Sequence, residues 1–146
     1  MNWRPALYEW AEARLGDAFE WGRTDCALLM LEACDIIRGT DDATDYRGRW
    51  QTRIGAIRYI AETETPSDYL RKAGARTVAL HFQQAGDILL AQGEAYPDFR
   101  DCAHVCLGRR SLTADPEQGV VNVITGELTA LDPPPLIWRL AECRRH

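Results

Sequence analysis

A cysteine stands directly before one of the most apolar runs of this 146-residue chain, in the stretch FEWGRTDCALLMLEAC from Phe19 to Cys34. Thr24 and Asp25 are residue types that begin helices well, so Cys26 falls in the first turn of the helix that follows. The unpaired amides and the dipole at such a position favour a negative charge on sulfur. We therefore expect the Cys26 thiol to ionise more easily than a free thiol and to be a candidate nucleophile, the alternative being a small buried residue in a core helix.

A thiol nucleophile needs a base, and the chain contains three histidines. His104 lies within the run DCAHVCLG, which has the pattern of a strand, whereas His81 lies in a loop-like stretch and His146 is the last residue of the sequence. A nucleophile at a helix start that faces an imidazole on a strand is the papain-like solution, in which the two elements lie far apart in sequence. His104 is therefore the predicted general base, and His81 is the weaker candidate.

The same strand also offers metal ligands. Cys102, His104 and Cys106 alternate along it and so point to one face. Together with Cys26 they supply the thiolates and the imidazole that zinc prefers. Ligands at every second residue of a flat strand converge poorly on a tetrahedral ion, so we expect neither a metal nor another cofactor. Cys102 and Cys106 are instead expected to pack as small residues under the helix.

Two kinds of hydrophobic pattern divide the chain. Pro5 and the spacing of apolar residues predict a first helix that ends at Gly16, and a second helix, apolar on nearly all sides, runs from residues 24–25 to about Ile37. After a polar, turn-rich segment at residues 39–50, helices are predicted near residues 50–61 and 66–74. The runs DILLA, CAHVCLG, GVVNVI and LIWRL then predict strands. Residues 1–146 are therefore expected to form one α+β domain, with N-terminal helices and a buried central helix packed on a mostly antiparallel C-terminal sheet.

Composition excludes several classes of function. The net charge is −5, from 22 acidic and 17 basic side chains, so no basic surface for nucleic acid is expected. The longest apolar run, Ala27 to Leu31, is too short to cross a bilayer, and an N-terminal stretch that contains Glu9 and Glu12 does not have the pattern of a signal peptide. Five cysteines, an odd number, predict reduced thiols rather than a disulfide framework. We expect synthesis in the cytoplasm, with neither nucleic acid nor membrane as a partner.

Three segments, in order, resemble the motifs of the NlpC-type cell-wall peptidases, a papain-like superfamily. FEWGRTDCALLM resembles the cysteine motif of that family, QQAGDILLA resembles its strand opening at Gly86 and Asp87, and HVCLGRRSL resembles its histidine strand. The resemblance covers about residues 19–112. The segments YRGRW and LIWRL are more similar to the small branch found in phage and prophage tails.

The resemblance implies a role for each matching residue. Cys26 would be the nucleophile and His104 the general base, while Asp25 would cap the helix and the amide of Cys26 would contribute to an oxyanion hole. Trp21 falls where the family has an aromatic residue that lines the cleft, although a core tryptophan explains it equally well. Family members cleave amide bonds in the peptide stems of peptidoglycan. A tail-associated member would be made in the host cytoplasm without a signal peptide, and other tail-tip or baseplate proteins would be its partners.

Three departures from the family pattern leave the activity open. Ala27-Leu28 stands where the family has Ser-Gly, and the strand after His104 is about two residues shorter. The third polar residue, which orients the imidazole, is not at the expected spacing. Asp115 is the predicted third catalytic residue, with Thr113 and Asn122 as alternatives, and loss of such an orienting residue lowers the rate of serine proteases by orders of magnitude. The alternative functions are a catalytically inactive tail-tip assembly protein and an intracellular thiol amidase.

Overall fold

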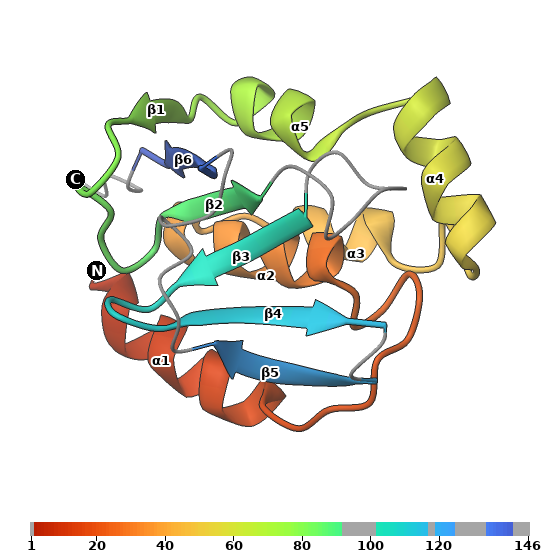
Figure 1. The fold of residues 1–146 in the computed structure, drawn as a ribbon, viewed down its shortest axis with the longest axis horizontal. Helices are drawn as coiled ribbons and strands as arrows, with labels where there is room; N and C mark the ends of the chain where they lie inside the picture. Colours follow the sequence, from red (N-terminus) through yellow and green to blue (C-terminus); the bar gives the residue numbers. More distant parts are fainter. Residues whose placement is uncertain (1, 92–101, 117–118, 125–133, 142–146) are drawn as a thin grey trace.

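The computed structural model describes residues 2–91, 102–116, 119–124 and 134–141, and the side chains of residues 115, 123 and 124 lie outside this description. The described residues form five helices and six strands (Figure 1). The helices are α1 (Trp3–Arg14), α2 (Cys26–Arg38), α3 (Asp42–Tyr46), α4 (Arg53–Glu62) and α5 (Pro66–Lys72). The strands are β1 (Arg76–Val78), β2 (Ile88–Ala91), β3 (Cys102–Cys106), β4 (Ser111–Asp115), β5 (Val120–Ile124) and β6 (Leu136–Arg139).

The six strands make one sheet in the order β1-β6-β2-β3-β4-β5, and every neighbouring pair is antiparallel. Helix α2 packs across β3 and β4 on one face of this sheet, and α1 and α3 pack against α2 in turn (Figure 1). The prediction of an α+β domain, with a central helix on an antiparallel sheet, is confirmed. The β2–β3 register pairs Leu89 with His104, which fixes how the histidine strand lies against its neighbour.

Local signals in the sequence set both ends of α2. Asp25 has an extended backbone and its side chain accepts the N–H of Leu28, so the helix begins at Cys26. Gly39 ends the helix with a φ of 71°, a left-handed conformation that glycine adopts without a steric penalty. The helix is the centre of the core because most of its side chains are buried against the sheet or against α1. Those buried side chains are Leu28, Leu29, Met30, Leu31, Glu32, Ala33, Cys34 and Ile37.

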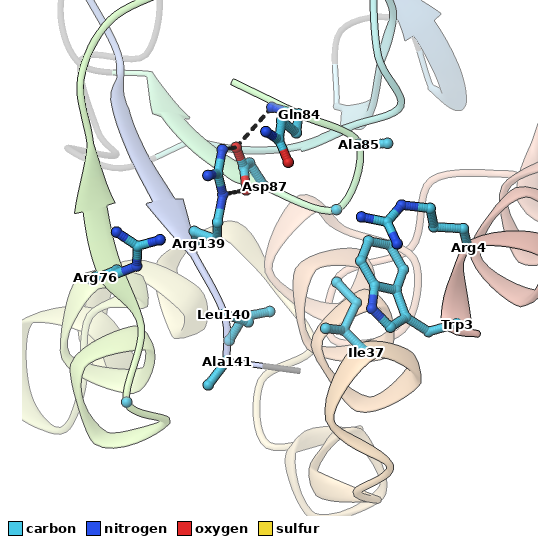
Figure 2. Close-up of a pocket in the computed structure, with 12 residues that line it drawn as sticks. Trp3, Arg4, Ile37, Arg76, Gln84, Ala85, Asp87, Arg139, Leu140 and Ala141 are labelled. Atoms are coloured by element: carbon cyan, nitrogen blue, oxygen red, sulfur yellow. Dashed lines mark hydrogen bonds and ion pairs between the residues drawn. The ribbon is translucent and has the colours of Figure 1, made fainter. Parts of the chain in front are cut away.

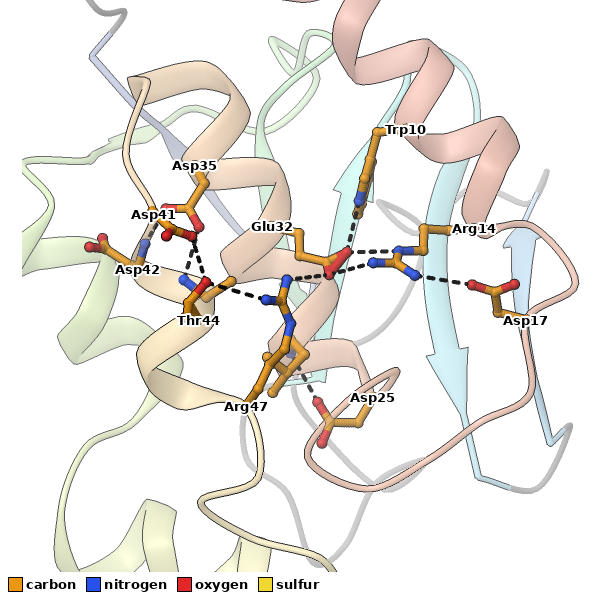
Figure 3. A network of polar contacts seen from close by, with 12 residues as sticks. Trp10, Arg14, Asp17, Asp25, Glu32, Asp35, Asp41, Asp42, Thr44 and Arg47 are labelled. Atoms are coloured by element: carbon orange, nitrogen blue, oxygen red, sulfur yellow. Dashed lines mark hydrogen bonds and ion pairs between the residues drawn. The ribbon is translucent and has the colours of Figure 1, made fainter.

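Glu32 interrupts the apolar surface of α2, which the sequence pattern predicts to be apolar on nearly all sides. Its side chain is 6% exposed and accepts hydrogen bonds from Trp10 Nε1 (2.9 Å), Arg14 Nε (2.8 Å) and Arg14 Nη2 (2.9 Å). Arg47 Nη2 adds a fourth contact at 3.2 Å (Figure 3). A buried carboxylate is tolerated when it is paired and hydrogen-bonded in this way. Glu32 therefore ties α1 and the end of α3 to the central helix.

Three short elements were not among those predicted from the sequence, α3, β1 and β4. Helix α3 lies in the segment predicted to be turn-rich, and its first amides are satisfied from another helix, since Asp35 of α2 accepts the N–H groups of Asp42 (2.8 Å) and Ala43 (2.9 Å). Strand β1 has only three residues and is held by pairing with β6. In addition, α4 begins at Arg53 because Thr52 caps it, a few residues later than expected.

The face of the sheet away from α2 has a smaller apolar cluster of its own. Leu89, Cys106 and Ile137 are buried there, with Val78 and Leu80 packed against them. Side chains alternate along a strand, so Ala103 and Val105 of β3 join the α2 core, whereas Cys106 points the other way. The expectation that Cys106 packs under the helix is therefore wrong.

Candidate functional site

The loop before α2 is built around the buried carboxylate of Asp25. One oxygen accepts the N–H of Leu28 (2.9 Å), and the other accepts the N–H groups of Gly22 (2.8 Å) and Trp50 Nε1 (2.6 Å). Gly22 has a φ of 77°, and a Cβ there would lie 2.0 Å from the carbonyl oxygen of Trp50, so only glycine fits this turn. Asp25 is thus the N-cap of α2 and also the anchor of the segment that precedes Cys26.

Cys26 is the first residue of α2, and the residue as a whole is partly exposed although its sulfur is buried. Its Sγ lies 3.8 Å from Sγ of Cys102, the first residue of β3, and the backbone N–H of Ala103 is also directed to the Cys26 sulfur. The four cysteines within the described residues, including these two, are free thiols. The nearest sulfur neighbour of the predicted nucleophile is therefore a second thiol.

This contact lies where the pairing of β3 with β4 stops. The two strands pair at Val105–Leu112 and Cys106–Ser111, but the ladder does not continue to Cys102. The hydroxyl of Thr113 bridges the unpaired part by donating to the carbonyl of Ala103 (2.9 Å). The start of α2 therefore lies against the part of β3 whose backbone groups do not pair with β4. Thr113 makes this bond to the backbone, not to the imidazole that it was considered to orient.

The surroundings of Cys26 change its acidity in the direction opposite to the prediction. The hydrogen bond with Cys102, burial of the sulfur and the charge of Asp25 raise the pKa of the Cys26 thiol well above its ordinary value. The helix terminus alone would lower this pKa, but the neighbouring thiol and the carboxylate outweigh it. The expectation that the Cys26 thiol ionises more easily than a free thiol is therefore wrong for this structure.

His104 is almost completely buried, with 1% of its surface exposed. Neither ring nitrogen has a hydrogen-bond partner among the described residues, so the imidazole does not bond to the Cys26 thiol here. His104 and Cys102 lie on the same side of β3 because they are two residues apart, which separates them by about 7 Å along the strand. The structure therefore buries the predicted base on the strand that carries Cys102, and no hydrogen bond joins the imidazole to either thiol among the described residues.

The remaining predicted residues lie in several places. Asp115 ends β4, but its side chain lies outside the described part of the structure. Asn122 lies on β5 and is exposed. Trp21 is partly buried in the loop before α2 and packs edge-to-face on Phe19, with ring centroids 4.8 Å apart. His81 is exposed, with a left-handed φ of 73°.

The metal alternative was considered for Cys26, Cys102, His104 and Cys106. Within the described ranges, no group of three His, Cys, Asp or Glu side chains is arranged to hold a metal ion. Cys102, whose sulfur contacts that of Cys26, was assigned from the sequence only to this metal site or to core packing. The one signal that could have found it is its position at the predicted start of the histidine strand.

None of the helices that the structure describes has the length and apolar character to span a bilayer.

Comparison with known proteins gives a family but no activity. No curated protein matches this chain, and no solved structure matches it. The model of one family does match, over residues 1–131, which is most of the 146-residue sequence. The chain therefore belongs to the family described as Domain of unknown function (DUF6950).

Proposed function

We propose that the protein is a cysteine-dependent amide hydrolase of papain-like, NlpC-type fold, which cleaves the peptide stems of peptidoglycan as a component of a phage tail. The observation that carries this proposal is the buried imidazole of His104, whose two nitrogens lack hydrogen-bond partners among the described residues and which lies on the same strand as Cys102, the neighbour of Cys26. Buried polar side chains are nearly always hydrogen-bonded, so an orphaned imidazole calls for a functional explanation. Cys26 at the helix start supplies the nucleophile, and the order of helices and strands agrees with the proposed fold.

In the proposed reaction, His104 takes the proton of the Cys26 thiol, and the thiolate attacks the carbonyl carbon of the amide bond. The amine leaves with the proton from the imidazolium, and water then hydrolyses the thioester to release the acid and the free thiol. The Cys26–Cys102 contact has to open first, because it raises the pKa of Cys26. A χ1 rotation of Cys26 between staggered positions moves its sulfur without moving the backbone.

Clearing of peptidoglycan embedded in a gel, under reducing conditions, tests the proposal. The wild-type protein should clear the gel and release new amino groups from the wall, whereas Cys26→Ala should do neither. Cys102→Ala is the matched control, since it removes the neighbouring thiol and keeps the nucleophile. The hydrolase is refuted if Cys26→Ala clears as well as the wild type, or if the wild type releases no amines.

A second candidate is a tail-tip assembly protein that uses the same fold without catalysis. Two observations favour it, the raised pKa of Cys26 and the absence of a hydrogen bond from its thiol to His104 within the described structure. In that case Cys26→Ala should leave particle assembly unchanged, and neither form should release amines from the wall. Normal assembly combined with loss of amine release in Cys26→Ala would instead favour the hydrolase.

A further inference from the structure

The contact between Cys26 and Cys102 brings together two thiols from distant parts of the chain. Their sulfurs are 3.8 Å apart, although the two residues are 76 positions apart in the sequence. The sulfurs of a disulfide are about 2.05 Å apart, so these two need to approach by about 1.8 Å to be joined. Rotation about the Cα–Cβ bonds moves each sulfur while the backbone stays in place. The two thiols are therefore placed for a cross-link that keeps the fold.

Hydrogen bonds fix the backbone on each side of this contact. Asp25, directly before Cys26, accepts three N–H groups through its buried carboxylate. Cys102 belongs to the paired part of the β2–β3 ladder, and the carbonyl of the next residue, Ala103, accepts the hydroxyl of Thr113. Two groups that are held side by side in this way have a high effective concentration toward each other. A reaction between the two sulfurs is therefore fast once one of them is activated.

The other two cysteines within the described residues lie away from this pair. Cys34 is eight residues after Cys26 on α2, which corresponds to about 12 Å. Cys106 is four residues after Cys102 on β3, about 13 Å away, and packs in the apolar cluster on the other face of the sheet. A disulfide spans at most about 7 Å between Cα atoms. An oxidant is therefore expected to join Cys26 with Cys102.

A pocket of about 360 Å³ lies toward the other end of α2, and no cysteine lines it (Figure 2). Its lining residue on α2 is Ile37, eleven residues from Cys26 and therefore about 16 Å away. Trp3 also lines this pocket and belongs to the main core. Because Trp3 lies away from the thiols, its indole N–H reports whether the core stays intact when they are oxidised.

We propose that Cys26 and Cys102 form an oxidation site, at which hydrogen peroxide converts the two thiols into an intramolecular disulfide. The Cys26 thiolate attacks one oxygen of the peroxide, which gives a sulfenic acid at Cys26, and the hydroxide that leaves takes up the proton of the thiol. The Cys102 thiol then attacks the sulfenic sulfur and displaces its oxygen as water. In sum, the two thiols lose two hydrogens and two electrons, and one peroxide becomes two molecules of water.

The two thiols have different parts in this reaction. Residue 26 is partly exposed, whereas Cys102 is 4% exposed, so Cys26 is the one that meets the peroxide. Its raised pKa makes the thiolate scarce near neutral pH, so the first step is slow and becomes faster as the pH rises. The effect on activity rests on the proposed hydrolase, because the disulfide would block its nucleophile. The cross-link itself forms whether or not the protein cleaves the wall.

The test treats the full chain with hydrogen peroxide and dimedone, which traps sulfenic acids, at about pH 7 and about pH 9. All proteins carry Cys143→Ser, because residue 143 lies outside the described residues. Mass spectrometry of peptides prepared without a reductant detects the disulfide and the dimedone adduct. Cys102→Ala removes the second thiol, and Cys106→Ala is the matched control, since it removes another buried cysteine of β3. Nitrogen–proton NMR spectra follow the Trp3 indole, which Trp3→Phe identifies.

We expect the peptides of Cys26 and Cys102 to become joined, faster at the higher pH, and to be separated again by dithiothreitol. Cys106→Ala should behave in the same way, with the Trp3 signal unchanged by oxidation. Cys102→Ala should instead accumulate the dimedone adduct at Cys26. The proposal is overturned if both thiols remain reduced after a day with peroxide at the higher pH, or if a different pair of cysteines is joined. Equal amounts of adduct with and without Cys102, or loss of the Trp3 signal on oxidation, would overturn it as well.

Discussion

Replacing Asp25 with asparagine tests how the start of α2 and its thiol are held. The substitution keeps the shape of the side chain but exchanges one acceptor oxygen for an NH₂ group. If the remaining oxygen caps Leu28, the NH₂ group faces the N–H groups of Gly22 and Trp50, which Asp25 accepts at 2.8 and 2.6 Å. Each buried donor left unpaired costs about 1–3 kcal/mol, so the free energy of unfolding should fall by about 2–6 kcal/mol. That is a large part of the 5–15 kcal/mol (roughly) that keeps a domain folded.

Urea denaturation of Asp25→Asn, compared with Thr52→Ala, measures this difference. Thr52 caps α4 at an exposed position through a single bond to Gly55 N (3.0 Å), so its loss should cost only about 1 kcal/mol. Under native conditions Asp25→Asn should also react faster with iodoacetamide at Cys26, because the charge of Asp25 raises the pKa of that thiol. If the two variants lose equal stability, the buried anchor inferred for Asp25 is wrong. Unchanged alkylation of Cys26 would refute the electrostatic part.

Three further predictions concern the thiols and the imidazole. Cys102→Ala removes the hydrogen bond that raises the pKa of Cys26, so alkylation of Cys26 near neutral pH, followed by mass spectrometry, should become several-fold faster; an unchanged rate would contradict this cause. Burial raises the pKa of Cys34 and Cys106 above an ordinary value of 9.0, so in alkali the unfolded chain releases protons that the folded chain keeps. The free energy of unfolding should therefore fall as the pH rises above about 9, and the fall should be smaller in Cys34→Ala, as urea midpoints across this range will measure. His104→Leu removes a buried, unpartnered imidazole and should raise the free energy of unfolding by about 1 kcal/mol, whereas a decrease would show that the ring nitrogens have partners.

The parts of the fold that were predicted from sequence are those with local signals. Helix α2 follows from Asp25 before it, Gly39 after it and an apolar run between them. The strands β2, β3, β5 and β6 follow from short apolar runs bounded by polar or turn residues. In these elements the residues that decide the structure lie within a few positions of one another, so a single sequence contains the information.

The parts that were missed depend on residues far apart in the chain. Helix α3 is capped by Asp35 of another helix, and β1 exists as a strand through its pairing with β6. The contact of Cys26 with Cys102 joins residues 76 positions apart and depends on where the β3–β4 ladder stops. No hydrophobic periodicity in the sequence indicates where the β3–β4 ladder ends. The residue types of the site could be predicted, but the partner that sets the acidity of the thiol could not.

The end of the β3–β4 ladder is where fold and proposed chemistry meet. Continued pairing would place β4 against the backbone groups of Ala103, and the sulfur of Cys26 could not approach them. Because the ladder ends earlier, the Thr113 hydroxyl satisfies the carbonyl of Ala103, and the N–H of Ala103 is left to face the thiol. Free N–H groups beside a nucleophile are the donors that stabilise an oxyanion, which the proposed hydrolase requires. Cys102 occupies the same gap and raises the pKa of Cys26, so the identity of residue 102 should control the availability of the nucleophile.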